Sequence, residues 1–228
     1  MTDWEDYAKR QHMQVTDLST WLIELLREKN SRTITDFGCG DGMLLRSVAN
    51  SGIKPHFQLI GVDHSRLRLD RLAQNLPSAT LVQADVSKQL QLAPQSVDLA
   101  ISTQVIEHVP DQKAMLNEMA RLTKPGGRLF LTTVFKRWYA WYFHRCEGRW
   151  VLDPTHLREY SANDQLLPDV EAAGFRVLKE RKIQLAYPLV DPLLKWMGRP
   201  LLRLGWLHKI KLPIPGYYTW EIVAERKS

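Results

Sequence analysis

Cysteine is scarce in this chain, and long apolar runs are absent. Only Cys39 and Cys146 occur in 228 residues, and their spacing is typical of neither a disulfide framework nor a zinc site. No stretch approaches the roughly 20 consecutive apolar residues of a membrane-spanning helix. The N-terminal sequence MTDWEDYAKR lacks the apolar segment of a secretory signal. We therefore expect a cytoplasmic protein, and we predict no metal site.

Charge and length leave several functions open. The formal net charge is +6 at pH 7, a mild excess that is compatible with an anionic partner, a membrane surface or nucleic acid but selects none of them. With 228 residues and a hydrophobic content of 44%, the chain is long enough for one α/β domain with a sizeable core and short for two. We expect a single domain over residues 1–228.

Strand-like and helix-like segments alternate along the chain after an N-terminal helical segment over residues 1–30. The expected strands cover residues 33–37, 59–63, 80–84, 97–103, 128–133, 175–183 and 217–227. The expected helices between them cover residues 42–50, 65–75, 111–122 and 161–173. This alternation predicts the α/β class with a doubly wound, mostly parallel sheet. The cofactor-binding core is expected over 31–183, an insertion over 184–216 and the last strand over 217–228.

Three glycines follow the first expected strand, in the stretch TDFGCGDGML over residues 35–44. In doubly wound sheets, ligands bind beyond the carboxyl ends of the strands, which is where this turn lies. The next two expected strands end in acidic residues, with Asp63 placed to accept the hydroxyls of a ribose and Asp85 placed to meet an adenine. The turn is either a tight strand–helix connection or the cradle of a ligand, and the two aspartates favour the cradle.

The glycine spacing and the local charge both argue against a nicotinamide dinucleotide. The dinucleotide fingerprint requires a third glycine three residues after the second, and Met43 occupies that position. Asp36 and Asp41 would repel a pyrophosphate at short range, because like charges in a partly desolvated loop cost roughly several kcal/mol. Carboxylates would attract the ammonium and sulfonium groups of S-adenosylmethionine, which also carries a ribose and an adenine. The sequence therefore predicts S-adenosylmethionine as the cofactor.

With these features the sequence resembles the class I S-adenosylmethionine-dependent methyltransferases, and it looks most like their small-molecule branch. The resemblance covers roughly residues 30–183. It rests on five motifs in order, namely Asp36-Phe-Gly-Cys-Gly-Asp-Gly42, Gly61-Val-Asp63, Ala84-Asp85-Val86, Ser96-Val-Asp-Leu-Ala-Ile-Ser-Thr-Gln-Val-Ile-Glu-His-Val109 and Leu122-Thr-Lys-Pro-Gly-Gly127. The resemblance implies a Rossmann-like sheet of seven strands, in which the last strand runs antiparallel between the fifth and the sixth.

The resemblance also implies a set of cofactor-binding residues. By this likeness Asp36 lies close to the ammonium group, Asp63 takes the ribose hydroxyls and Asp85 takes the adenine amino group. The two glycines and the residues that end the fourth strand lie beside the methionyl part. The whole implied set is Asp36, Gly38, Gly40, Asp63, Asp85, Thr103 and Gln104.

Methyl transfer is an in-line displacement that proximity and orientation alone can promote, so the chain needs no dedicated catalytic residue. A base is still useful where the acceptor must lose a proton. His108 follows the fourth strand and His156 precedes Leu-Arg-Glu-Tyr160, and either histidine is a candidate base. The alternative for His108 is that it only packs beside the cofactor.

Two segments extend beyond the minimal fold. Residues 135–145 concentrate aromatic and cationic side chains, which could line an acceptor pocket, cover the sheet or stack on nucleic acid. The insertion over 184–216 places Lys195, Arg199 and Arg203 on one face of an expected helix and apolar residues on another. Such a basic amphipathic segment serves either as an aromatic and basic cap over the substrate site or as a peripheral membrane contact.

The function that this sequence favours is methylation of a small organic acceptor, with oxygen as the expected atom and an apolar or lipid-linked acceptor as one option. Nucleic acid is not an expected partner, because the fourth strand is followed by Thr-Gln-Val-Ile rather than an Asn/Asp-Pro-Pro-aromatic element, and no cysteine nucleophile stands there. Two alternatives remain, a nicotinamide-dependent oxidoreductase and a non-catalytic module of the same fold that docks on a membrane or a partner.

Overall fold

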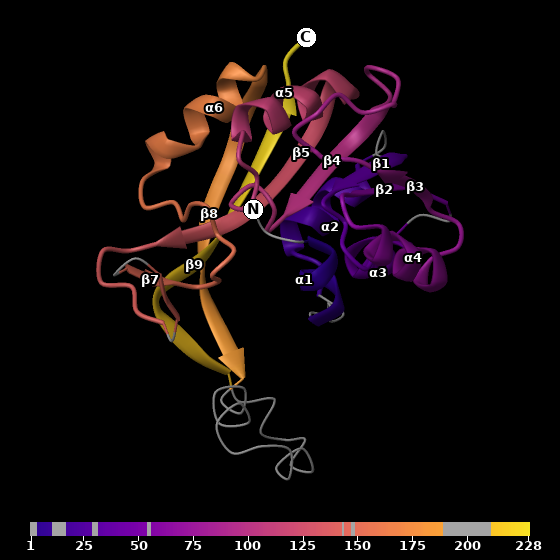
Figure 1. Ribbon diagram of the computed structural model, residues 1–228. Coiled ribbons are helices and arrows are strands. Elements are labelled where there is room, and N and C mark those ends of the chain that lie inside the picture. Colours follow the sequence, from indigo (N-terminus) through magenta and orange to yellow (C-terminus); the bar gives the residue numbers. More distant parts are fainter. Residues whose placement is uncertain are drawn as a thin grey trace.

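The protein is built on one large sheet with helices on both faces (Figure 1). We describe its computed structural model, which covers residues 4–10, 17–28, 32–53, 56–142, 144–146, 149–188 and 211–228. The helices are α1 (Trp4–Arg10), α2 (Thr20–Arg27), α3 (Met43–Ala49), α4 (Arg66–Asn75), α5 (Gln112–Leu122), α6 (Leu167–Ala172) and the 3₁₀ helix η1 (Asn163–Gln165). Among these described helices, none combines the length and the apolar character needed to cross a bilayer.

The large sheet has seven strands in the order β3-β2-β1-β4-β5-β9-β8. Its strands are β1 (Thr33–Phe37), β2 (Gln58–Asp63), β3 (Thr80–Gln83), β4 (Val97–Thr103), β5 (Thr123–Lys136), β8 (Phe175–Pro188) and β9 (Lys211–Arg226). Strands β1 to β5 pair in parallel, and β9 lies antiparallel between β5 and β8. The predicted α/β class and the predicted seven-stranded order are confirmed.

Apolar side chains on the two faces of the sheet form two separate cores. Helices α2, α3 and α4 cover one face, with Leu26, Leu45 and Leu72 fully buried against it. Helices α5 and α6 cover the other face, with Met119 and Val170 fully buried (Figure 1). Burial on both faces explains why the central strands are almost continuously apolar in sequence.

Two capping residues place helices next to the carboxyl edge of the sheet. The hydroxyl of Ser65 accepts a hydrogen bond from the backbone N–H of Arg68 at the start of α4. The carboxylate of Asp111 accepts one from the N–H of Ala114 at the start of α5. Both contacts satisfy an N–H group that the first helical turn leaves without an intrahelical partner.

The structure corrects two of the predicted boundaries in the core. The strand expected over 128–133 starts earlier, because β5 already pairs with β4 at Thr123, and the residues from there up to 127 form an irregularity in the ladder. The helix predicted over 161–173 is a 3₁₀ turn followed by the short α6. The N-terminal helical segment predicted over 1–30 contains α1 and α2, and residues 1–3, 11–16 and 29–31 lie outside the described part.

The insertion predicted over 184–216 is shorter than the sequence suggested. Strands β8 and β9 continue to pair with each other past the other strands, so residues 184–188 and 211–216 belong to the sheet. Residues 189–210, which include Lys195, Arg199 and Arg203, lie outside the described residues. Within the aromatic-rich stretch, the hairpin of β6 (His144–Cys146) and β7 (Arg149–Val151) was not predicted.

Candidate functional site

The glycine turn after β1 is held tightly against its surroundings. The N–H groups of Gly38 and Cys39 both donate to the carbonyl of Val62 at the end of β2, at 2.7 and 2.9 Å. Gly38 has a φ of +81°, and a Cβ atom there would lie 2.4 Å from a methyl group of Val105 in the loop after β4. A side chain at this position would clash and strain the backbone. Only glycine lets the turn approach this loop so closely.

Asp63 connects the end of β2 to the glycine turn. One carboxylate oxygen accepts a hydrogen bond from the N–H of Gly40 at 2.9 Å, and the other accepts one from the N–H of Ser65, also at 2.9 Å. Burial raises the pKa of Asp63, and these two hydrogen bonds oppose that rise. Because a carboxylate offers about four acceptor positions, it retains capacity for further hydroxyl donors.

Asp36 lies near the end of β1 as a buried carboxyl group, with 1% of its surface exposed. Burial and the nearby negative charge of Asp63 raise the pKa of Asp36 to about 7. Among the described residues, its Oδ1 atom has no hydrogen-bond partner. A buried polar atom of this kind costs free energy until a donor reaches it. Asp36 therefore fits the ammonium group of the predicted cofactor.

The negative charge of Asp41 is balanced by neighbouring cations, so Asp41 does not repel a pyrophosphate as the sequence analysis expected. Its carboxylate lies 3.6 Å from the guanidinium of Arg68 and 3.4 Å from that of Arg71, both on α4. These two cations offset its charge, and its side chain is 5% exposed. The repulsion of a pyrophosphate, which was assigned to Asp36 and Asp41 together, therefore rests on Asp36 alone.

The remaining predicted cofactor residues follow the neighbouring strands. Asp85 comes after β3, and one of its oxygens accepts hydrogen bonds from the N–H and the hydroxyl of Ser87 at 2.8 and 2.6 Å. Partial burial acts to raise the pKa of Asp85, but these hydrogen bonds hold it below its ordinary value. Thr103 ends β4, and Gln104 follows with a φ of +56° and its N–H bonded to the carbonyl of Thr132.

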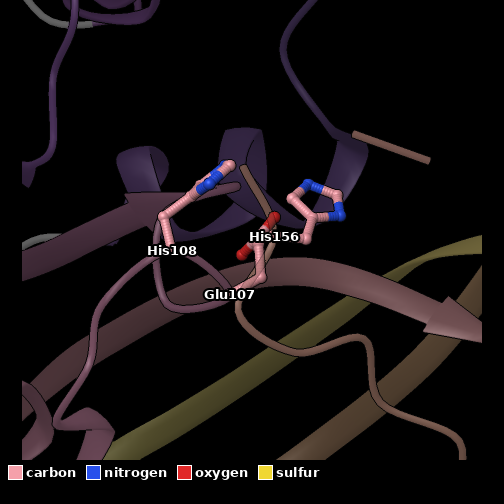
Figure 2. Close-up of side chains that lie close together, drawn as sticks. All are labelled: Glu107, His108 and His156. Carbon is pink, nitrogen blue, oxygen red and sulfur yellow. The ribbon is translucent and has the colours of Figure 1, made fainter. Parts of the chain in front are cut away.

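The structure brings the two candidate histidines together. His108 and His156 lie in edge-to-face contact with their ring centroids 4.8 Å apart (Figure 2). The Nδ1 atom of His108 lies 3.2 Å from the carbonyl oxygen of Thr155. Burial, together with the neighbouring His156, lowers the pKa of His108 to about 4, so this ring is neutral at pH 7.

Sequence reasoning did not single out Glu107, which completes this cluster. Its side chain is fully buried, and one of its oxygens accepts a hydrogen bond from the hydroxyl of Thr133 at 2.8 Å. The other oxygen has no hydrogen-bond partner among the described residues, and burial raises the pKa of Glu107 to about 7. The feature of the sequence that could have pointed to Glu107 is its position directly before His108, a candidate base.

Glu107, His108 and His156 each offer one nitrogen or oxygen atom that could bind a metal ion, and these atoms all lie within 4.8 Å of one another (Figure 2). This spread is compatible with an ion held among the three side chains. The absence of a metal, which the sequence predicted, stays a prediction.

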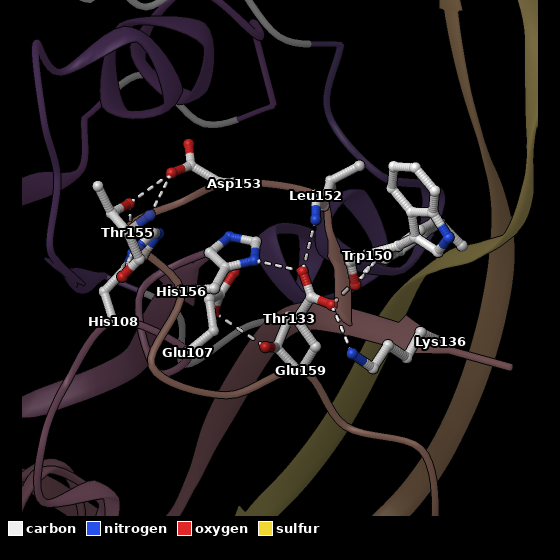
Figure 3. A network of polar contacts seen from close by, with 11 residues as sticks. Glu107, His108, Thr133, Lys136, Trp150, Leu152, Asp153, Thr155, His156 and Glu159 are labelled. Atoms are coloured by element: carbon white, nitrogen blue, oxygen red, sulfur yellow. Dashed lines mark hydrogen bonds and ion pairs between the residues drawn. The ribbon is translucent and has the colours of Figure 1, made fainter. Parts of the chain in front are cut away.

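Residues 152–160 are tied to the loop after β4, and this brings His156 to the cluster (Figure 3). The N–H groups of Leu157 and Arg158 donate to the carbonyl of Glu107. The guanidinium of Arg158 donates to the carbonyls of Ile106 and Val109 at 2.9 and 2.5 Å. These four hydrogen bonds hold the segment that carries His156 against the loop that carries His108, and so they fix the two histidines relative to each other.

The aromatic segment over 135–145, which begins within β5, divides between the core and the surface. Phe135 is 3% exposed and contacts Trp220 edge to face at a centroid distance of 5.6 Å. Trp138, by contrast, is 95% exposed among the described residues, and Tyr139 and Trp141 are also exposed. Phe135 therefore covers the sheet, which is one of the three roles that the sequence analysis gave for this segment. The roles of the exposed aromatic residues stay a prediction.

A family model described as a methyltransferase domain matches residues 35–131, which run from β1 to β5. The ubiquinone biosynthesis O-methyltransferase of Proteus mirabilis is 28% identical over 142 residues, which are 60% of this chain and 56% of that protein. The chain spans about half the length of the curated relatives it matches.

Two solved structures illustrate the breadth of the fold. An S-adenosylmethionine-dependent methyltransferase from Mesorhizobium loti has a TM-score of 0.58 and 21% identity, covering 90% of this chain and 96% of that one. The [4+2]-cyclase SpnF has a TM-score of 0.63 and 19% identity, covering 91% of this chain and 81% of that one. At this identity the likeness concerns the fold alone, so activity has to be argued from the site.

Proposed function

Because the chain belongs to the class I S-adenosylmethionine-dependent methyltransferase family, we propose that it transfers a methyl group from S-adenosylmethionine to an oxygen of a small organic acceptor. The observation that carries the proposal is the buried Asp36 carboxyl group, one oxygen of which has no hydrogen-bond partner among the described residues. It lies beside a glycine turn whose close packing only glycine permits. A ligand that carries both a cation and a nucleoside fits this combination of a buried carboxyl group and a glycine turn.

The proposed cofactor site assigns a separate part of the ligand to each strand end. Asp36 receives the ammonium group, and the turn at Gly38 and Gly40 lies along the methionyl part. Asp63 accepts the ribose hydroxyls with the acceptor capacity that its two backbone contacts leave. Asp85 lies at the adenine, and its two hydrogen bonds from Ser87 fix its carboxylate.

Thr103 and Gln104 lie at the methionyl part in this proposal, at the junction of β4 and the loop that carries the histidines. When bound, S-adenosylmethionine supplies a methyl group on a positively charged sulfur. The chain's own contribution is to bind and orient both partners and, through His108 or His156, to take a proton from the acceptor.

The choice of oxygen and of a small acceptor rests on the relatives and on the absence of nucleic-acid elements. The Proteus mirabilis relative is named as an O-methyltransferase of ubiquinone biosynthesis, and this chain matches about half of it. That relative supports a small, apolar acceptor here. A peripheral membrane contact through 184–216 and a cytoplasmic location are further parts of this proposal.

Two experiments test the proposal. Isothermal calorimetry should detect binding of S-adenosylhomocysteine in the micromolar range and no binding of NADH. Binding of NADH without a response to S-adenosylhomocysteine would instead favour the oxidoreductase. Incubation of a small-molecule extract with the protein and methyl-labelled S-adenosylmethionine, followed by mass spectrometry, should reveal a labelled product. Cofactor binding with no labelled product from any extract would favour the non-catalytic module.

A further inference from the structure

His156 has a buried carboxylate, Glu159, as its partner. Its Nδ1 atom lies 2.9 Å from an oxygen of Glu159, and the two side chains are 5% and 2% exposed (Figure 3). A carboxylate can only accept a hydrogen bond, so Nδ1 carries the proton. The Nε2 atom of His156 is then left with a lone pair that can accept a proton.

Glu159 is itself fixed by contacts from three other segments (Figure 3). The oxygen that faces His156 also accepts a hydrogen bond from the N–H of Leu152 at 2.7 Å. Its other oxygen accepts from the ammonium of Lys136 on β5 at 3.0 Å and from the hydroxyl of Tyr217 on β9 at 3.3 Å. Burial acts to raise the pKa of Glu159, but the contacts with His156, Leu152 and Lys136 hold it below its ordinary value.

The contacts of His108 are of a different kind. Its Nδ1 atom faces the carbonyl oxygen and the hydroxyl of Thr155 at 3.2 and 3.1 Å. A neutral carbonyl orients an imidazole but stabilises its protonated form less than an ionised carboxylate does. Of the two candidate bases, the geometry selects the one that Glu159 supports.

We propose that His156 is the base that accepts the proton of the acceptor's hydroxyl and that Glu159 is the positioning residue that holds its tautomer and balances its charge. This inference rests on the proposed function. The proton passes to Nε2 of His156, and the oxygen's electron pair forms the new bond to the methyl carbon. The electron pair of the broken carbon–sulfur bond remains on sulfur, and the imidazolium later releases its proton to solvent.

Other charged and titratable groups face His156 from each element packed against it. Glu107 and His108 come from the loop after β4 and Asp153 from the same segment as His156, while Lys136 from β5 contacts Glu159. The distinguishing test must therefore report on the His156–Glu159 hydrogen bond alone rather than on the total charge of the cluster.

Nitrogen NMR of protein labelled with ¹⁵N-histidine reads this hydrogen bond directly, with the His156 signals assigned by their loss in His156→Gln. At pH 8 and with EDTA present, the wild-type ring should be at least about tenfold more populated as the Nδ1–H tautomer, since a hydrogen bond to a charged group contributes about 1.5–3 kcal/mol. A wild-type ring protonated mainly at Nε2 would overturn the proposal without any variant.

Glu159→Gln keeps the size of the side chain but can present either a carbonyl or an amide group to Nδ1, so both tautomers should become populated. Asp153→Asn is the matched control, because it removes an acidic group of the same segment whose observed hydrogen bonds go to Thr155. It should keep the single tautomer. An unchanged single tautomer in Glu159→Gln would count against the positioning role.

A second readout separates this inference from the proposed function. With a mixture of phenols and alcohols as acceptors, formation of S-adenosylhomocysteine should slow by about 10²–10⁴-fold in His156→Gln, the usual contribution of a general base. The affinity for S-adenosylhomocysteine should stay unchanged. An undiminished rate in His156→Gln overturns the base, whereas a wild-type protein that fails to bind S-adenosylhomocysteine overturns the proposed function itself.

Discussion

Replacing Asp36 by asparagine should move stability and cofactor binding in opposite directions. The carboxyl group is buried, and burial together with the charge of Asp63 raises its pKa from 3.8 to about 7. At about 1.4 kcal/mol per pKa unit, ionising Asp36 in the folded protein therefore costs about 4 kcal/mol more than ionising it in the unfolded chain. Asparagine has nearly the same size and cannot ionise.

The sign of the pH dependence follows from the raised pKa. The folded protein holds the proton more tightly than the unfolded chain, so the cost is absent below about pH 4, grows between pH 4 and 7 and is complete above that. We expect Asp36→Asn to be more stable than the wild type by up to about 4 kcal/mol at pH 8, with a smaller difference at pH 5. Urea unfolding followed by tryptophan fluorescence at both pH values measures this difference.

Binding should change the other way, because the ligand's ammonium loses its carboxylate partner. A hydrogen bond to a charged group contributes about 1.5–3 kcal/mol, so the Kd for S-adenosylhomocysteine should rise by about 10–150-fold at pH 8. Calorimetry measures it. A general folding defect would lower both stability and affinity, so the opposite signs are diagnostic. A variant that is less stable at pH 8 and binds as tightly as the wild type would refute the reasoning.

Three further outcomes are expected. Asp63→Ala should weaken binding of S-adenosylhomocysteine by about 1.5–3 kcal/mol in calorimetry, and an unchanged affinity would mean that the ribose lies elsewhere. Glu107→Gln should raise the free energy of unfolding at pH 8 more than at pH 5, because burial raises the pKa of Glu107 to about 7; an equal change at both pH values would contradict this. Anionic vesicles should sediment the protein at low salt, and the Lys195/Arg199/Arg203→Gln variant should lose about 3 kcal/mol of this attraction; no binding at low salt would leave the insertion as a cap.

Local chemistry in the sequence was sufficient to predict the framework of the site. The glycine turn and the acidic ends of β2 and β3 each depend on neighbouring residues only. Alternating strand and helix patterns then limited the sheet order to a few arrangements, and parallel strands bring their carboxyl ends to one edge. The position of the glycine turn was therefore predictable, whereas the place of the last strand in the sheet was implied by the family resemblance.

The roles of individual charges were not predictable, because a charge depends on what the folded chain places beside it. Asp41 looked like a ligand for a cation until α4 brought Arg68 and Arg71 against it. Glu107 was passed over, although the sheet buries it completely with one oxygen uncontacted among the described residues. Neither the contacts of Asp41 with the two arginines nor the burial of Glu107 can be predicted from a periodic pattern in the sequence.

By itself, the sequence determined the fold class and the edge of the sheet at which a ligand binds, since those follow from local patterns of period 2 and 3.6 and from turn chemistry, whereas the place of the last strand was implied by the family resemblance. Only the tertiary structure decided which histidine has a carboxylate behind it. The pairing of His156 with Glu159 depends on Lys136 from β5 and Tyr217 from β9 holding that carboxylate. Such contacts join residues tens of positions apart, and burial, which sets their strength, exists only once both faces of the sheet are covered.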